Sequence, residues 1–305
     1  MDWKSEIESA AARIKGHVVQ TPVMRSDALW DRDIELKLEH LQHTGSFKAR
    51  GAFNTLTALD VPAGGVVAAS GGNHGAAVAF AASRLGHRAR IFVPEIAGPS
   101  KIALIERTGA DLTVVPGEYA DALALAQRYE AEQGAMQVHA YDAPHTVAGQ
   151  GTVLREWEAQ GLEADTLLIA VGGGGLIAGA LAWAQGARKI VAVEPMSCCA
   201  LAKALEAGEP VDVPVSGVAA NALGARRIGS ICFDLARQKE TKVALVPDGA
   251  ILQAQMALWQ SHRVLVEPAG ACALAALQWG AYVPDPGERV AVLLCGGNIA
   301  PDPLG

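Results

Sequence analysis

Residues 66–86 read VVAASGGNHGAAVAFAASRLG, and this stretch decides the fold class of the chain. Its apolar start, residues 66–70, is typical of a short buried strand. The alanine-rich run 75–85 predicts a helix, because alanine has the highest helix propensity, and Gly86 ends that helix. The polar glycine turn 70–75 connects the two elements. A strand, a turn and a helix in this order indicate an α/β protein.

The same alternation of strand and helix continues along the chain. Further strands are predicted at residues 88–94, 111–115, 136–139, 167–171, 189–193 and 290–294. Helices are predicted at residues 100–107, 119–132, 152–160 and 176–185. We therefore expect two lobes, each a mostly parallel sheet covered by helices. Residues 1–64 and 144–305 would form the large lobe and residues 65–143 a small mobile lobe, whereas 206–229 show no clear pattern.

The bulk composition argues against several classes of protein. A net charge of −7 over 305 residues argues against a nucleic-acid partner, since phosphate binding needs a basic surface. The five cysteines are an odd number without C-x-x-C spacing, so we expect no disulfide framework or zinc site and a reducing cytoplasm. Residues 1–8 are charged where a signal peptide is apolar. The uncharged run 166–184 is interrupted by four glycines, so no membrane span is expected.

Two polar segments are candidates for chemistry. The first, at residues 46–51, reads SFKARG and contains Lys48, whose amine can form an imine with an aldehyde cofactor and then act as a base. On its own, a lysine at a helix start is more often an exposed side chain. The second is the turn 70–75, which places backbone N–H groups at a helix N-terminus and so suits a carboxylate. Asn73 in this turn can also donate to an aromatic hydroxyl.

Two glycine segments complete the pattern. Gly172–Gly175 follow a predicted strand and open a helix, so their backbone amides can hold a phosphate. They are not a dinucleotide fingerprint, because Ile177 occupies the last glycine position. Residues 295–298, CGGN, end the last predicted strand, and the thiol of Cys295 is too weak an acid to keep a pyridine nitrogen protonated. An imine-forming lysine, a phosphate cradle and loops for a ring and a carboxylate predict a pyridoxal phosphate (PLP) site.

These four segments resemble the serine/threonine dehydratase family of fold type II PLP enzymes. That family includes serine racemases and, more distantly, cysteine synthase, threonine synthase and the tryptophan synthase β chain. The resemblance covers nearly the whole chain, with further similarity in LEHLQ at 38–42, AGQGT at 148–152, VEP at 193–195 and VEPAG at 266–270. It implies PLP-dependent β-elimination of a β-hydroxy amino acid, L-threonine or L-serine, to a 2-oxo acid and ammonia.

The resemblance also implies roles for individual residues. Lys48 would bind PLP and remove the α-proton, with Phe47 beside the ring and Asn73 on the ring hydroxyl. The phosphate would lie against the large-lobe residues Gly172, Gly173, Gly174, Gly175 and Leu176. Cys295 would partner the ring nitrogen. The substrate carboxylate would be bound by Ser70, Gly71, Asn73 and His74. Members of the family are commonly homodimers, so a homodimer is expected.

Two positions depart from the racemases of the family. Gly71 stands where the racemases have a second serine that carries a proton, which disfavours racemisation. Glu194 is the implied ligand of a monovalent or divalent cation, but Ala200 replaces the second carboxylate. Because hard cations need several oxygen ligands, the loss of this carboxylate weakens a divalent site.

Several alternatives remain open at this point. Threo-3-hydroxyaspartate, phenylserine or an intermediate of hydroxyectoine breakdown would suit the same chemistry, and serine racemisation is a further activity. The side-chain pocket that would decide among these substrates has four candidate residues, which are Arg25, Tyr119, His145 and Arg226. A nicotinamide-dependent oxidoreductase is disfavoured by the missing fingerprint. A non-enzymatic PLP or amino-acid binder is disfavoured by Lys48.

Overall fold

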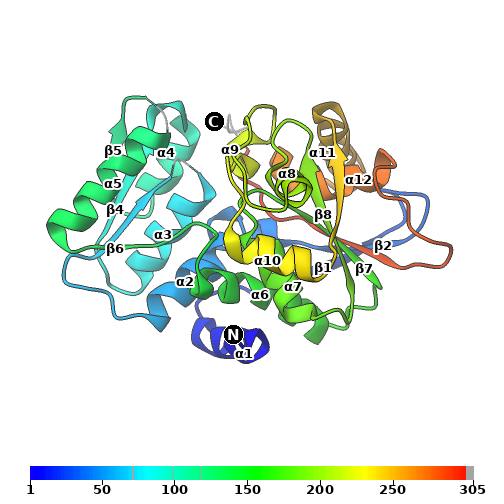
Figure 1. Cartoon of the computed structure of the whole chain (residues 1–305), viewed down its shortest axis with the longest axis horizontal. Helices are drawn as coiled ribbons and strands as arrows, with labels where there is room; N and C mark the ends of the chain where they lie inside the picture. The colour runs from blue at the N-terminus through cyan, green and yellow to red at the C-terminus, as the bar shows by residue number, and fades with distance from the viewer. Residues whose placement is uncertain (71, 98, 118, 300–305) are drawn as a thin grey trace.

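The larger of two β-sheets lies on one side of the molecule (Figure 1). The computed structural model describes residues 1–70, 72–97, 99–117 and 119–299. Within these residues the larger sheet has six strands in the order β1-β2-β10-β7-β8-β9. Their bounds are β1 Val23–Ser26, β2 Ile34–Lys37, β7 Thr166–Ala170, β8 Lys189–Pro195, β9 Lys242–Val246 and β10 Val290–Leu293. The β1–β2 pair is antiparallel, and all other neighbours in the sheet are parallel.

The smaller sheet is formed by the middle of the chain and is parallel throughout. In the described part of the chain it has four strands in the order β5-β4-β3-β6. Their bounds are β3 Val66–Ala69, β4 Ala89–Pro94, β5 Asp111–Val115 and β6 Met136–Gln137. The helices around it are α3 Asn73–Arg84, α4 Pro99–Glu106 and α5 Tyr119–Gln133, with the 3-10 turn η3 Glu95–Ala97 (Figure 1). The predicted α/β fold with mostly parallel sheets is confirmed, whereas the proposed division into two lobes stays a prediction.

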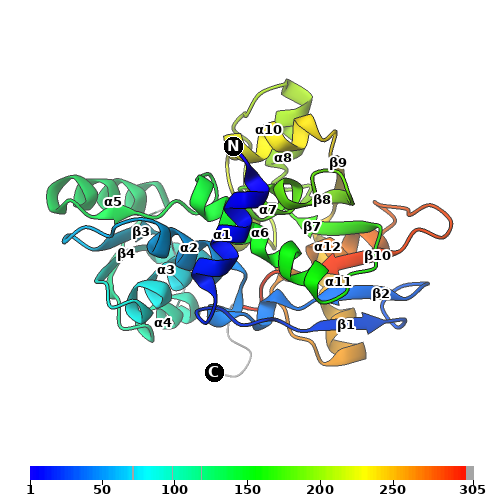
Figure 2. The same ribbon diagram turned by 90° about the horizontal axis from the view of Figure 1, so that it is seen from below.

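The remaining helices cover the larger sheet and connect it to the smaller one (Figure 2). They are α1 Trp3–Ile14, α2 Lys48–Ala58, α6 Pro144–Ala159, α7 Gly175–Ala184, α8 Ala200–Ala207, α9 Ala220–Leu223, α10 Ser230–Gln238, α11 Asp248–His262 and α12 Pro268–Gln278, with the 3-10 turns η1 Glu39–Leu41 and η2 His43–Gly45. Helix α12 packs on β7, β8, β9 and β10, while α2 packs on both α3 and α6. Helix α2 therefore joins the helices of the two sheets.

Helix α6 begins at Pro144, eight residues before the start predicted from the sequence. Its interior glycines discouraged the prediction, since glycine weakens a helix. Here they are required by packing: a Cβ on Gly149 would lie 2.7 Å from the carbonyl oxygen of Arg50 on α2, and one on Gly151 would lie 2.5 Å from Ile7 on α1. Close helix packing therefore offsets the weak helix propensity of these residues.

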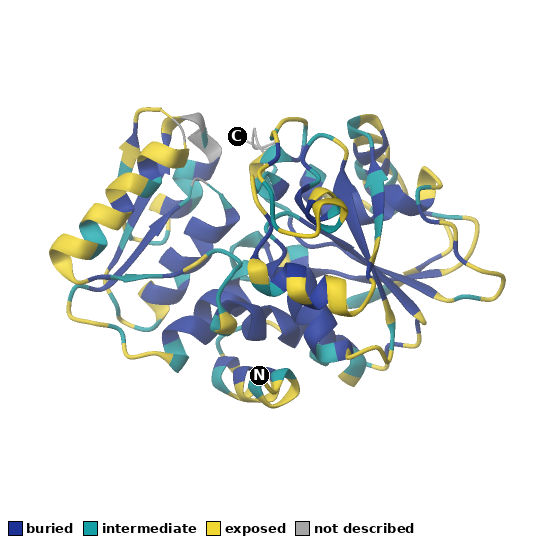
Figure 3. Cartoon of the chain, viewed as in Figure 1, coloured by how far each residue is buried: buried dark blue, intermediate teal, exposed yellow. Residues whose placement is uncertain are grey.

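The strands of both sheets are buried, and the exposed residues lie on the outer faces of the helices and in loops (Figure 3). Burial of all residues of β3, β7 and β10 agrees with the continuous apolar runs that predicted them. Within the part of the chain that the structure describes, no helix combines the length and apolar character that crossing a membrane requires.

Candidate active site

One cavity brings residues from all four predicted segments together. It is lined by Phe47, Lys48, Asn73, Ala170, Gly172, Gly173, Gly174, Gly175, Leu176, Ala222, Leu223, Glu267, Ala269 and Cys295. The carboxyl ends of β7 and β10 and the N-termini of α2, α3, α7 and α12 meet there. Parallel α/β sheets usually bind ligands at this edge. All the residues predicted to hold the cofactor therefore lie around one space.

Lys48 is the first residue of α2 and projects into this cavity. The backbone on its N-terminal side is tied to the end of β10, because Phe47 N–H donates to the carbonyl oxygen of Cys295 at 3.2 Å. Lys48 Nζ donates to the carbonyl oxygen of Ala140 at 2.7 Å. Burial lowers the pKa of the Lys48 amine to about 8, against the weaker opposite effect of Cys295. A substantial share of molecules therefore carries a neutral, nucleophilic amine near neutral pH.

The glycine segment between β7 and α7 leaves no room for side chains. Gly174 has φ +95°, and a Cβ there would lie 2.5 Å from Cys232 Sγ. A Cβ on Gly172 would lie 2.8 Å from the Cα of Leu223. Bare backbone at the N-terminus of α7 presents N–H groups and the positive end of the helix dipole to the cavity. This cradle fits the phosphate of PLP.

Asn73, the first residue of α3, is held from two directions. Its Nδ2 donates to Glu267 Oε1 at 2.5 Å, and its Oδ1 accepts from Asn298 Nδ2 at 2.8 Å. Asn298 Nδ2 also donates to the carbonyl oxygen of Thr44 at 2.7 Å. An amide nitrogen carries two N–H groups, so the second one on Asn73 can donate to the ring hydroxyl of PLP.

Glu267 is a site residue that the sequence analysis did not single out. It precedes α12, is 3% exposed and lines the cavity. Burial raises the pKa of its carboxyl to about 7, although Lys101 and Asn73 oppose that shift. The only sequence signal for it was its place in the quoted segment 266–270.

Cys295 lies directly after β10 and is 3% exposed. Its Sγ donates to the carbonyl oxygen of Ala269 at 3.5 Å, and burial raises its pKa to about 12. The thiol is therefore neutral at physiological pH. It fits the predicted partner of a pyridine nitrogen that is not kept protonated.

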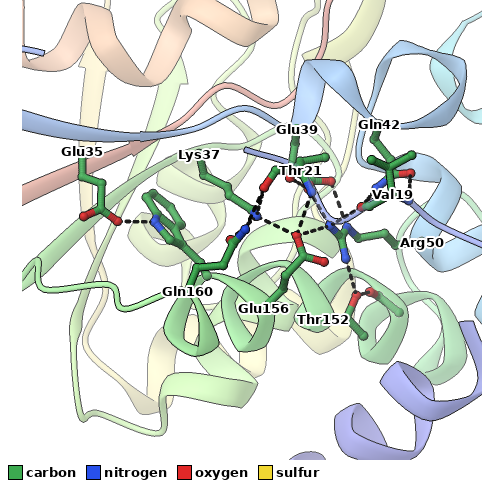
Figure 4. A network of polar contacts seen from close by, with 12 residues as sticks. Val19, Thr21, Glu35, Lys37, Glu39, Gln42, Arg50, Thr152, Glu156 and Gln160 are labelled. Atoms are coloured by element: carbon green, nitrogen blue, oxygen red, sulfur yellow. Dashed lines mark hydrogen bonds and ion pairs between the residues drawn. The ribbon is translucent and has the colours of Figure 1, made fainter. Parts of the chain in front are cut away.

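A buried network of charges fixes α2 and, with it, Lys48 (Figure 4). Arg50 binds both carboxylate oxygens of Glu39, with its Nε at 2.9 Å and its Nη2 at 2.7 Å. Arg50 Nη2 also donates to Glu156 Oε1 at 3.0 Å, and Lys37 Nζ donates to the same oxygen at 2.6 Å. Two cations face two anions, so the charges balance in a setting where Lys37, Glu39 and Arg50 are at most 1% exposed. The network joins β2, α2 and α6.

The predicted substrate loop lies beside the cavity at the N-terminus of α3. Ser70 Oγ accepts from the backbone N–H of Gly72 at 3.2 Å. His74 is buried, its Nε2 lies 2.8 Å from the carbonyl oxygen of Val138, and burial lowers its pKa to about 3. Gly71 lies outside the described residues. His74 is therefore a neutral side chain that ties α3 to the end of β6.

Glu194, the candidate cation ligand, is fully buried on β8, away from the residues that line the cavity. Its two carboxylate oxygens accept the backbone N–H groups of Leu201 and Ala202 at 2.8 Å each, so it caps α8. Among the described residues, no group of three or more His, Cys, Asp or Glu side chains is arranged to hold a metal ion. Its role as a cation ligand stays a prediction.

The four candidates for the side-chain pocket, Arg25, Tyr119, His145 and Arg226, are not among the described residues that line the cavity. The expectation was wrong for Arg25, which lies on the edge strand β1 and donates to Glu163 at 2.8 Å. The exposed ion pair explains why Arg25 is on the surface, since both groups keep their hydration.

Comparison with known proteins identifies the class of protein. A model of the family described as "Pyridoxal-phosphate dependent enzyme" matches residues 14–296. Maize serine racemase has a similar structure, with a TM-score of 0.92 and 33% identity, covering 98% of this chain and 94% of that one. A threonine deaminase from the organism abbreviated T.th. has a TM-score of 0.89 and 33% identity, covering 98% and 99%. The fold and the site are those of a fold type II PLP enzyme.

Curated relatives agree over nearly the full length. Phenylserine dehydratase of Ralstonia pickettii is 35% identical over 302 residues, covering 96% of this chain and 92% of that protein. L-threonine ammonia-lyase of Geobacter sulfurreducens is 35% identical, covering 96% and 75%. The chain therefore belongs to the family of pyridoxal-phosphate dependent enzymes and uses PLP as its cofactor. The predicted family, fold class and cofactor are confirmed.

Proposed function

We propose that the chain catalyses the β-elimination of a β-hydroxy amino acid, L-threonine or L-serine, to a 2-oxo acid and ammonia. The observation that carries this proposal is the Lys48 amine with its lowered pKa, facing a phosphate cradle across one cavity. Relatives named L-threonine ammonia-lyase and phenylserine dehydratase support the same reaction class. When bound, the cofactor withdraws electrons from the substrate Cα and so makes its proton removable.

Lys48 has the properties required of the base that takes this proton. Its Nζ lies at the cavity wall, and the carbonyl oxygen of Ala140 at 2.7 Å orients it. A pKa of about 8 lets the amine both accept and release a proton near neutral pH. The charge network through Arg50 keeps the helix that carries Lys48 in place.

Substrate binding is assigned to the loop of Ser70, Gly71, Asn73 and His74. The N-terminus of α3 supplies backbone N–H groups and a positive dipole for the substrate carboxylate. Movement of residues 65–143 as a small lobe would bring this loop onto the substrate and exclude water. Its own sheet, separate from the larger one, supports such a movement.

Two alternatives keep the cofactor and change the outcome. Phenylserine, threo-3-hydroxyaspartate or a hydroxyectoine-breakdown intermediate could replace threonine and serine, and a phenylserine dehydratase is among the relatives. Serine racemisation is favoured by the similarity to maize serine racemase. It is opposed by the glycine at position 71, which has no side chain to carry a proton.

Release of 2-oxo acid from the holoenzyme tests these proposals. The panel is L-serine, L-threonine, both threo-3-hydroxyaspartates and phenylserine, with D-serine formation followed in parallel. Lys48→Ala should lose both turnover and the covalent link to PLP. An active Lys48→Ala enzyme with normal PLP absorbance would sink the assignment.

The proposed homodimer is supported by one exposed apolar helix face. Leu252, Met256 and Trp259 on α11 are 44%, 59% and 47% exposed and recur at the spacing of one helix face. Met256→Glu should shift the protein from dimer to monomer in light scattering, and a wild-type monomer would contradict the proposal. The five cysteines are all free, which supports a reducing, cytoplasmic location.

A further inference from the structure

Lys101 on α4 is a buried lysine beside the proposed substrate loop. Its side chain is 4% exposed. A Cβ built on Gly72 would lie 3.7 Å from Lys101 Nζ, so the ammonium faces this loop. With the described residues, Lys101 Nζ forms no hydrogen bond and no ion pair within 4.0 Å. Its position therefore lacks the direct counter-ion that a buried ammonium requires.

Glu267 is the acidic residue whose field reaches Lys101. Burial lowers the pKa of Lys101, and the Glu267 carboxylate acts in the opposite direction. Glu267 Oε1 is already hydrogen-bonded to Asn73 at 2.5 Å. The carboxylate therefore offsets part of the charge of Lys101 from a distance and leaves its ammonium able to bind another anion.

We propose that Lys101 is a further substrate-binding residue whose ammonium pairs with a carboxylate of the amino-acid substrate at the Ser70–His74 loop. The inference rests on the proposed function. His74 is neutral, and Lys48 is directed at the cofactor, so neither supplies a lasting positive charge to this loop. Backbone N–H groups of α3 would bind the carboxylate by partial charges, and Lys101 adds a full one.

Two carboxylates are possible partners, and non-reactive ligands distinguish them. L-alanine has only the α-carboxylate and L-aspartate has a second one, and neither has a β-hydroxyl to eliminate. Calorimetric titration of the PLP-loaded enzyme measures both affinities. Lys101→Met should weaken binding by about 10- to 100-fold, the effect expected for losing a charge-assisted hydrogen bond. Lys101→Arg should retain most of the affinity, and Lys101→Gln replaces Lys101→Met if that variant does not fold.

Loss of affinity for both ligands identifies the α-carboxylate, and loss for L-aspartate alone identifies the side-chain carboxylate. Lys203→Met is the matched control, because Lys203 is 53% exposed and pairs with Glu206 on α8. Unchanged affinity in Lys101→Met, or no binding of either ligand to the wild type, would overturn the inference. Turnover is not needed for this measurement. A weakened Lys101→Met enzyme without any elimination activity would therefore refute only the proposed function.

Discussion

The side chain of Asn73 donates a hydrogen bond to Glu267 across 2.5 Å and so joins the start of α3 to the start of α12. Helix α3 packs on the smaller sheet and α12 on the larger one. Asn298 holds the other end of the same amide. The orientation of Asn73 in the cavity therefore depends on residues from the opposite sheet.

Replacing Glu267 should affect cofactor binding through Asn73. Glu267→Leu removes the acceptor, leaves a buried N–H unpaired and frees the amide to rotate. We expect a loss of about 1–3 kcal/mol in PLP binding, measured by titrating the apoprotein with PLP. Glu267→Gln keeps an acceptor oxygen and is the matched control, with a smaller loss. Equal PLP affinity in the Leu variant and the wild type would show that Glu267 does not position Asn73.

The lowered pKa of Lys48 predicts how PLP incorporation depends on pH. Only the neutral amine attacks the aldehyde, so the rate of covalent capture by apoprotein should rise up to about pH 8 and level off above it. A lysine with an ordinary pKa would show a rise that continues to about pH 10.4. Stopped-flow absorbance measures the rate, with Lys48→Ala as the blank. A profile that still rises at about pH 10 would contradict the burial effect.

The buried network predicts a large effect of removing Arg50. Arg50→Met leaves Glu39, fully buried, without its counter-ion. We expect a loss of about 3–5 kcal/mol in the free energy of unfolding, measured by urea denaturation. Arg289→Met is the control, because its pair with Asp165 is exposed, with side chains 60% and 49% accessible, and should cost at most about 1 kcal/mol. Similar losses in the two variants would contradict this account.

Local sequence patterns predicted the fold class, most strands and the four segments of the cofactor site. They could not predict contacts between distant parts of the chain. Arg50 and Glu156 are 106 residues apart and Asn73 and Glu267 are 194 apart, so only the tertiary fold brings each pair together. For the same reason Lys101 read as an ordinary helix lysine. Burial, which the sequence does not show, distinguishes it from an exposed one.

The position of Glu194 predicts that divalent cations are dispensable. Its carboxylate faces the first turn of α8, where both oxygens accept backbone N–H groups at 2.8 Å. The positive end of the helix dipole occupies the side of the carboxylate that a cation would need. Dialysis of the holoenzyme against EDTA should therefore leave its activity unchanged. Glu194→Ala should lower the free energy of unfolding by about 1–3 kcal/mol, because buried N–H groups lose their acceptors. Activity lost in EDTA and restored by Mg²⁺ would show instead that a cation shares the carboxylate with α8.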